Sequence, residues 1–263
     1  MRLRIHLLMR AKLNHFTLIL ASVFLFSCEK KTEEFQTDSL LDYTMLAPGK
    51  YITYRLDSTV FVNFGRNTEV HSFQEKHEVD AQVTDNLGRT AYRIFRYLRD
   101  TAGLSPVWTS AGSYLVTPTN NTIEVIEDNL RFVKLVLPVK QDITWKGNRF
   151  LPDEAYSPLF SFQNDFDMAD WDYTYSSLGE TIQLNGQTIE NVLTVDGINI
   201  SSNVPVTDVN SYGFIDYMQD RYAKGIGLVY QEFIMWDYQP PNQSATTGYK
   251  TGFGIKRSMI DHN

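Results

Sequence analysis

Residues 181–195 read Thr-Ile-Gln-Leu-Asn-Gly-Gln-Thr-Ile-Glu-Asn-Val-Leu-Thr-Val, two alternating runs on either side of Asn185-Gly186. Asn and Gly tolerate the positive φ that both central residues of a type I′ turn require, and this turn matches the twist of the strands it joins. Asn-Gly between alternating runs is therefore the strongest short-range signal for a hairpin. The sequence predicts two antiparallel strands, 181–184 and 187–195, joined by this turn.

The same period of two recurs along most of the chain after residue 50. Apolar and polar residues alternate over 51–56 and 92–98, and the runs 122–126 and 130–137 are separated by the turn residues 127–129. Residues two apart share one face of a strand, so such alternation indicates strands with one buried face. The 15 Tyr and 16 Phe residues agree, because aromatic side chains fit a pleated, half-buried surface.

These runs predict an all-β, mainly antiparallel fold in one domain over residues 46–263. Roughly 10–12 strands are expected, as a single strongly curved sheet or an open or closed β-barrel, since curving or closing a sheet protects its edges. Residues 152–169 alternate poorly and contain Pro152 and Pro158, so we expect at most one short helix or a crossing loop there.

The first 27 residues have the three parts of an export signal. The basic part holds four cations and no acid: Arg2, Arg4, Arg10 and Lys12. An apolar run of 11 residues, Phe16–Phe26, follows and ends at the small residue Ser27. A transmembrane helix needs roughly 17–25 apolar residues, so this run is too short to remain as a span. We expect it to be cleaved, with translation starting at Met1 or Met9.

Cys28 is the only cysteine of the chain and directly follows this signal. The run Leu25-Phe26-Ser27-Cys28 resembles the lipobox of bacterial lipoproteins, although Phe26 is larger than the residue usual there. The resemblance implies cleavage just before Cys28 and lipidation of that residue. Several acyl chains, each contributing about 0.8 kcal/mol per buried CH₂, would anchor the protein to a membrane. The alternative is an ordinary signal peptide followed by an incidental cysteine.

Residues 28–45 are predicted to form the lipidated terminus and a flexible tether, because residues 29–42 are largely polar and charged. Lys30-Lys31 followed by Glu33-Glu34 also resembles the charged tags that send some Gram-negative lipoproteins to the cell surface. A plain tether is the alternative. The expected location is the outer membrane, facing the periplasm or the cell surface.

The composition excludes several classes of function. The chain holds 24 basic and 31 acidic residues, and four of the basic ones belong to the signal, so the mature protein is strongly acidic and is expected to repel nucleic-acid phosphates. A single cysteine forms no disulfide within one chain. The sequence contains no nucleophile elbow, zinc-binding His-Glu-x-x-His run or phosphate-binding loop. We therefore expect no cofactor.

Two further segments carry a resemblance. The first is Leu137-Pro-Val-Lys140 with Thr144-Trp-Lys-Gly-Asn148, and the second is Tyr222-Ala-Lys-Gly-Ile-Gly-Leu-Val-Tyr-Gln-Glu232. Both resemble elements of uncharacterised Gram-negative envelope lipoproteins whose domains are similar to the lipoprotein carriers of the Lol system. The resemblance implies a curved antiparallel sheet and no catalytic residue. Read without it, Gly225 and Gly227 predict a tight turn or bulge before the strand that starts at Leu228.

Aromatic residues at period two are the candidate ligand contacts. Two groups share a strand face each: Trp171, Tyr173 and Tyr175, and then Trp236 and Tyr238. Such a stripe forms part of the ordinary core, lines an apolar cavity for an acyl chain, or offers a platform on which a sugar ring stacks. Burial distinguishes these readings, since a sugar platform needs exposed rings.

Two groups of acidic and histidine side chains are weak candidates for metal sites. One is the acidic cluster Asp165, Asp167, Asp170 and Asp172, which lacks the spacing of an EF-hand loop. The other is His71, Glu75 and His77, but residues six apart in a strand lie about 20 Å from each other. We expect an acidic loop and a solvated polar face, and no bound metal.

The sequence thus favours a non-catalytic outer-membrane lipoprotein whose β domain binds an apolar ligand or an envelope protein. A surface glycan-binding lipoprotein and a carboxylate-dependent hydrolase are the alternatives. The first predicts a deep apolar cavity on the concave face of the sheet, the second an exposed Trp171 or Trp236 in a shallow groove, and the third two carboxylates in one cleft.

Overall fold

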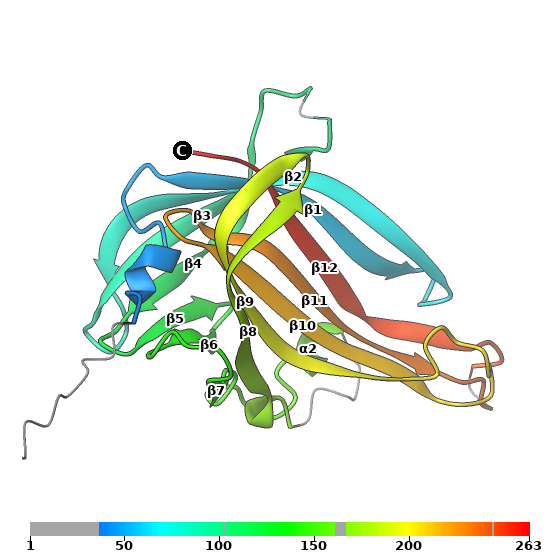
Figure 1. Cartoon of the computed structure of the whole chain (residues 1–263). Helices are drawn as coiled ribbons and strands as arrows, with labels where there is room; N and C mark the ends of the chain where they lie inside the picture. Colours follow the sequence, from blue (N-terminus) through cyan, green and yellow to red (C-terminus); the bar gives the residue numbers. More distant parts are fainter. Residues whose placement is uncertain (1–36, 103, 161–166, 244) are drawn as a thin grey trace, which may run out of the picture. The chain divides into compact units, whose positions relative to one another are not determined.

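A computed structural model of the protein describes residues 37–102, 104–160, 167–243 and 245–263, and these form one antiparallel sheet of 12 strands (Figure 1). The strands are β1 (Tyr51–Val62), β2 (Asn67–Thr84), β3 (Thr90–Asp100), β4 (Thr109–Pro118), β5 (Thr122–Glu127), β6 (Leu130–Val136), β7 (Thr144–Lys146), β8 (Asp172–Leu184), β9 (Gln187–Ser202), β10 (Gly213–Ala223), β11 (Gly227–Gln239) and β12 (Tyr249–His262). The described helical segments are η2 (Leu40–Tyr43), α2 (Ser157–Phe160) and η3 (Met168–Asp170). The predicted all-β fold with one short α-helix is confirmed.

The sheet consists of two meanders joined at their outer members. Strands β1 to β6 neighbour one another in sequence order, β7 to β12 do the same, and β1 pairs with β12. The two edges of the sheet are therefore β6 and β7, which are consecutive in the chain. The curved antiparallel sheet implied by the resemblance to Lol carriers is present.

The hairpin at Asn185-Gly186 forms as predicted. Both residues have positive φ, 49° and 81°, and Leu184 pairs with Gln187 across the turn. Both strands are longer than the sequence indicates, because three register irregularities in the β8–β9 pairing interrupt the period of two. The β5–β6 turn also forms, with Asp128 and Asn129 at positive φ, but Glu127 belongs to β5.

Gly225 and Gly227 make the predicted turn and bulge between β10 and β11. Both have positive φ, and the register shifts where Arg221 pairs with Tyr230 and Tyr222 with Leu228. One consequence is that Val229 is fully buried in a small cluster with Tyr54, Ile189, Val192 and Met259. The tip of the β8–β9 hairpin reaches the same region, where Asn185 Nδ2 donates to the Met259 carbonyl at 2.8 Å.

The two edge strands are fastened to each other largely through side chains. The indole Nε1 of Trp145 in β7 donates to the Val133 carbonyl of β6 at 2.8 Å, and the Val133 amide donates to the Gly147 carbonyl at 2.7 Å. The Tyr175 hydroxyl of β8 accepts from the Val136 amide at 2.8 Å and donates to the Val136 carbonyl at 2.7 Å. These bonds pair backbone groups that an open edge would leave unsatisfied, and they turn the curved sheet into a nearly closed barrel.

The segment before β1 differs from the predicted tether. Residues 28–36 of the predicted 28–45 stretch, and the whole signal with Cys28, lie outside the described residues. From Thr37 onward the chain packs on the barrel, with Leu40 and Tyr43 of η2 buried in the main core. The predicted linker rests on the largely polar composition of residues 29–42, which does not reveal that Leu40 and Tyr43 anchor the segment in the core. No helix in the described ranges is long and apolar enough to span a membrane.

The closure of the barrel makes Tyr175→Phe a sensitive test. Removing this hydroxyl leaves the amide and the carbonyl of Val136 unpaired in a partly buried seam, so we expect a loss of about 1–3 kcal/mol in the free energy of unfolding. Tyr51→Phe is the matched control, because its hydroxyl bonds Asp261 in an exposed position and its loss should cost about 0.5 kcal/mol or less. Urea unfolding followed by fluorescence measures both; equal losses would show that the seam does not depend on Tyr175.

Candidate functional site

The barrel interior contains a cavity of about 830 Å³ that is partly open to solvent. Its apolar lining comes from two facing walls of the sheet. One wall contributes Ile94, Val116, Ile123, Val125 and Phe132 of β3 to β6, and the other Met218, Leu228, Phe233, Phe253 and Ile255 of β10 to β12. Pockets that bind small molecules typically have volumes of about 300–1,000 Å³ and predominantly apolar linings. An apolar-lined cavity of the kind that the first functional hypothesis predicts is therefore present, with polar groups in part of its lining.

Aromatic rings border the cavity beside the connection between β7 and β8. Tyr156 and Phe160 contact the ring of Phe253 at centroid distances of 5.2 and 4.7 Å, and Phe233 contacts it at 5.3 Å. Edge-to-face and tilted contacts at these distances are favourable for aromatic pairs. The segment 152–169, predicted to hold a short helix or a crossing loop, thus supplies part of the lining.

A buried ion pair lies at the polar part of the cavity wall. Arg257 of β12 donates through Nε to Glu75 of β2 at 2.6 Å, and both side chains are less than a tenth exposed. Burial alone would raise the pKa of the Glu75 carboxyl, but the charge and hydrogen bond of Arg257, together with the neighbouring His77, outweigh it and hold this pKa well below its usual range. The carboxylate in turn raises the pKa of Arg257. Both groups are charged at neutral pH.

His77 and Tyr114 extend this polar region across β2 to β4. His77 Nδ1 lies 3.0 Å from the Tyr114 hydroxyl, and Nε2 lies 3.3 Å from Glu75 Oε2 without good hydrogen-bond geometry. Burial raises the pKa of Tyr114, so its hydroxyl keeps its proton and is able to donate to Nδ1. With Tyr114 as the donor, Nδ1 is the acceptor and Nε2–H faces Glu75.

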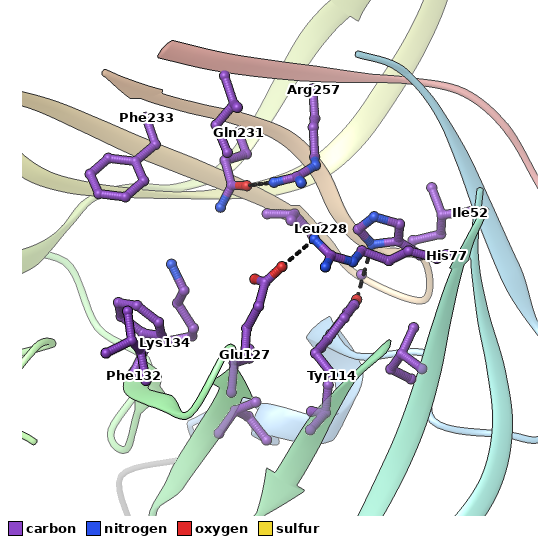
Figure 2. A pocket seen from close by; sticks show the side chains of 18 of the residues that line it. Ile52, His77, Tyr114, Glu127, Phe132, Lys134, Leu228, Gln231, Phe233 and Arg257 are labelled. Atoms are coloured by element: carbon purple, nitrogen blue, oxygen red, sulfur yellow. Dashed lines mark hydrogen bonds and ion pairs between the residues drawn. The ribbon is translucent and has the colours of Figure 1, made fainter. Parts of the chain in front are cut away.

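Two further ion pairs complete a belt of polar groups around the cavity. Lys134 of β6 donates to Asp220 of β10 at 3.1 Å, and Gln231 of β11 donates to the same carboxylate at 2.8 Å. Gln231 also accepts from Arg257, which links this pair to Glu75. On the opposite wall Arg96 of β3 pairs with Glu127 of β5. Figure 2 shows Gln231 and Arg257 on one side of the cavity and Glu127 and Tyr114 on the other, pointing toward each other.

The belt contains equal numbers of cations and carboxylates, but the cations lie closer to the cavity than the carboxylates do. Three cations, Arg96, Lys134 and Arg257, line the cavity, whereas two of their three carboxylates, Glu75 and Asp220, lie behind the lining. The cavity therefore presents mostly hydrogen-bond donors, with compensating charges in the surrounding wall. A polar end-group on an apolar ligand would meet these donors.

The aromatic residues predicted to contact a ligand are mostly part of the packed wall. Tyr173 and Tyr175 lie two apart in β8 and Trp171 directly precedes this strand; all three are buried, but only Tyr173 lines the cavity, while Tyr175 fastens the barrel seam. Trp236 is half-buried against Phe61 and Lys250, and Tyr238 is buried with its hydroxyl on the Val209 carbonyl. These positions do not give the exposed coplanar rings that a sugar platform needs.

Three of the weak metal candidates, Asp167, Asp170 and Asp172, line a second pocket beside Trp171, but they are not arranged as metal ligands. Asp165 lies outside the described residues, and in the described part of the chain no group of three or more His, Cys, Asp or Glu side chains is placed to hold a metal ion. Asp172 pairs with Lys146 at 2.9 Å. The solvated polar face expected for His71, Glu75 and His77 is wrong for two of the three, since only His71 is exposed and the others enter the buried belt.

The belt itself was missed by sequence analysis, although a weak signal exists. Gln231 and Arg257 each stand at an inward position of an alternating strand, two residues from Phe233 and Ile255, which also line the cavity. A polar side chain at an inward strand position, where its neighbours on that face are apolar, indicates a cavity in the interior. Their partners come from distant strands, so local spacing does not reveal the pairs.

Comparison with known proteins gives little further information. No family model and no curated protein matches the chain. Among solved structures, it is similar to a protein of Bacteroides fragilis described as exported with a YmcC-like fold, at a TM-score of 0.36 and 11% identity over 82% of this chain and 97% of that one. It is also similar to a domain from Vibrio parahaemolyticus described as an outer membrane lipoprotein-sorting protein, at a TM-score of 0.19 and 12% identity over 82% and 85%. Because both TM-scores lie below 0.5, neither similarity decides the function of this chain.

Proposed function

We propose that this protein is an exported, lipid-anchored envelope protein that binds a small apolar molecule inside its barrel. The observation that carries the proposal is the cavity of about 830 Å³ between two apolar walls. Protein interiors are packed as densely as organic crystals and contain few voids larger than a water molecule. A space of this size is therefore best explained as room for a ligand rather than as imperfect packing.

The chemistry of the lining suits an acyl chain. Aliphatic and aromatic side chains from β3 to β6 and from β10 to β12 surround the cavity, and the polar belt occupies part of its wall. Burying an alkyl chain contributes about 0.8 kcal/mol per CH₂. A free amphiphile and an acyl chain attached to an envelope protein would use the same space, and the first is the ligand we propose.

The envelope location rests on the sequence, because the signal and Cys28 lie outside the described residues. The apolar run, the lipobox-like segment and the single cysteine support export and lipidation. The outer membrane is the proposed destination. The compact unit that begins at Thr37 would then be held at the membrane surface by its N-terminus.

Filling the cavity tests the binding proposal. Native mass spectrometry of the full chain carrying Cys28→Ser, exported and purified without detergent, should show a co-purifying small molecule that is lost on denaturation. Val125→Trp adds an indole to the cavity wall, and we expect at least a tenfold loss of the adduct, because the ligand and the indole compete for one space.

Val70→Trp is the matched control, because Val70 is 60% exposed on β2 and does not line the cavity. It should retain the adduct, and both variants should keep the melting temperature of the parent within a few degrees. Equal retention of the adduct in the two variants would place the ligand elsewhere, and an apo mass in the parent would remove the support for a bound apolar molecule.

Lipidation is tested separately in the native host. Cys28→Ser removes the thiol that would carry the lipid, so we expect the protein to move from the membrane fraction to the soluble periplasmic or extracellular fraction. Ser27→Ala is the control, since a small residue remains before the cysteine and the protein should stay membrane-bound. An unchanged distribution of Cys28→Ser would show that the anchor does not depend on this residue.

A further inference from the structure

We infer that the protein pairs with a second copy of itself through the open edge of β2, so that the sheets of two barrels join in one antiparallel ladder. The open edge is residues 67–72, the part of β2 that extends beyond β3. The inference concerns the outside of the barrel and goes beyond the proposed binding of an apolar molecule in the cavity.

The open edge has a neighbouring strand on one side only. The pairing of β2 with β1 covers all of residues 67–72, whereas its pairing with β3 starts at Phe73. Figure 1 shows the β1–β2 hairpin running out past the end of β3. An edge strand presents a row of backbone N–H and C=O groups that another strand is able to pair with.

The direction of these backbone groups follows from one contact. The Thr101 hydroxyl, just after β3, donates to the Ser72 carbonyl, so the backbone groups of Ser72 face the β3 side. Backbone groups alternate in direction along a strand, so those of Thr68 and Val70 face the same side. No backbone group among the described residues pairs with them there.

This edge lacks the features that commonly protect an edge strand. Such strands often carry lysine or proline, or are turned away by a β-bulge. Residues 67–72 contain neither residue type, and the β1–β2 pairing runs without a register shift. Residues 67–71 are all exposed, with Val70 at 60%. A regular, exposed edge of this kind is a template for another strand.

The order of residues along the edge points to a second copy as the partner. In an antiparallel pair centred on Val70, this residue lies opposite itself. Thr68 then lies opposite Ser72, which joins positions whose backbone groups both face the open side. Glu69 lies opposite His71, and the two already contact each other within one chain at 2.9 Å. The edge is therefore complementary to itself in backbone direction and in side-chain chemistry.

The same arrangement explains exposed apolar side chains next to the edge. Phe64 in the β1–β2 turn is 89% exposed and has a φ of 57°, which is rare for a bulky residue. The carbonyl of Gly65 accepts from the Lys250 amide at 2.8 Å, which holds the turn in place. In the antiparallel pair, Phe64 of each copy would point toward the β3–β4 loop of the other. Leu104 and Val107 of that loop are 86% and 66% exposed.

A disulfide at the centre of the pair tests the inference in the native host. Opposed residues of a hydrogen-bonded antiparallel pair have Cα atoms about 5.5 Å apart, which is within the range of a disulfide. Val70→Cys in the full chain should therefore give a disulfide-linked dimer on a non-reducing gel. The parent chain, whose only cysteine is Cys28, measures the background.

Leu87→Cys is the matched control. Leu87 is 65% exposed and lies in the turn after β2, at the opposite end of that strand. A thiol there reports random collision between copies. We expect Val70→Cys to give at least about tenfold more dimer than Leu87→Cys, because only the first thiol has a partner at bonding distance.

The facing pair Glu69 and His71 tests the register. In the Val70→Cys chain, His71→Glu places carboxylates opposite each other on both sides of the centre, so the dimer should decrease about fivefold. Adding Glu69→Lys restores opposite charges and should restore the dimer. Both positions are exposed, so the purified variants should keep the melting temperature of the parent.

Three outcomes would overturn the inference. Equal dimer from Val70→Cys and Leu87→Cys would mean that the edges do not pair. A disulfide from Val70→Cys to a different protein would show that the edge binds another chain. A dimer that His71→Glu leaves unchanged, or that Glu69→Lys does not restore, would contradict the pairing centred on Val70.

Discussion

Closure of the sheet through Tyr175 and Trp145 is the constraint on which the interior depends. In a continuous ladder, neighbouring strands lie about 4.7–4.9 Å apart, and the side chains of a small barrel then fill its interior. Here the seam between β6 and the β7–β8 edge is bridged by a phenol hydroxyl and an indole N–H, with one backbone bond from Val133 to Gly147. These side-chain groups satisfy backbone positions that an open edge would leave unpaired. The barrel is thereby closed against edge pairing, and its 12 strands leave room for an interior cavity.

The polar belt is difficult to explain as a device for stability. Replacing a buried ion pair by well-packed apolar residues is often neutral or stabilising, because the desolvation of two charges offsets their attraction. The pairs Arg257–Glu75 and Lys134–Asp220 lie in walls that are otherwise apolar. They also join five strands, from β2 through β12, β11 and β10 to β6, so they fix the position of donors that face the cavity. A fixed set of donors next to an apolar space favours selective binding over simple packing.

The sequence predicts the strands and turns of this protein better than the side-chain contacts inside the barrel. The turn at Asn185-Gly186 and the bulge at Gly225 and Gly227 follow from local backbone preferences, so local sequence suffices for them. Alternation identifies the shared face of Tyr173 and Tyr175 in β8, but a residue in a packed wall, in a cavity lining or in a seam gives the same alternation, so their roles do not follow from it. Glu75 and Arg257 are 182 residues apart, and their pairing depends on the register of β1 between β2 and β12. No local sequence pattern contains this register, which is why the sequence predicts a solvated face for Glu75 and His77.

The N-terminal segment connects the proposed lipid anchor at Cys28 to the proposed binding cavity. Tyr43 and the three residues after it line the cavity, and Leu40 anchors the same segment in the core. Eight residues separate Cys28 from Thr37, where the compact unit begins, and a fully extended chain over these nine steps spans about 30 Å. A lipid on Cys28 would therefore keep the barrel within about one bilayer thickness of the membrane surface. An apolar ligand passing between that membrane and the cavity would cross little water, so the anchor itself would favour exchange with a lipid phase over capture from solution.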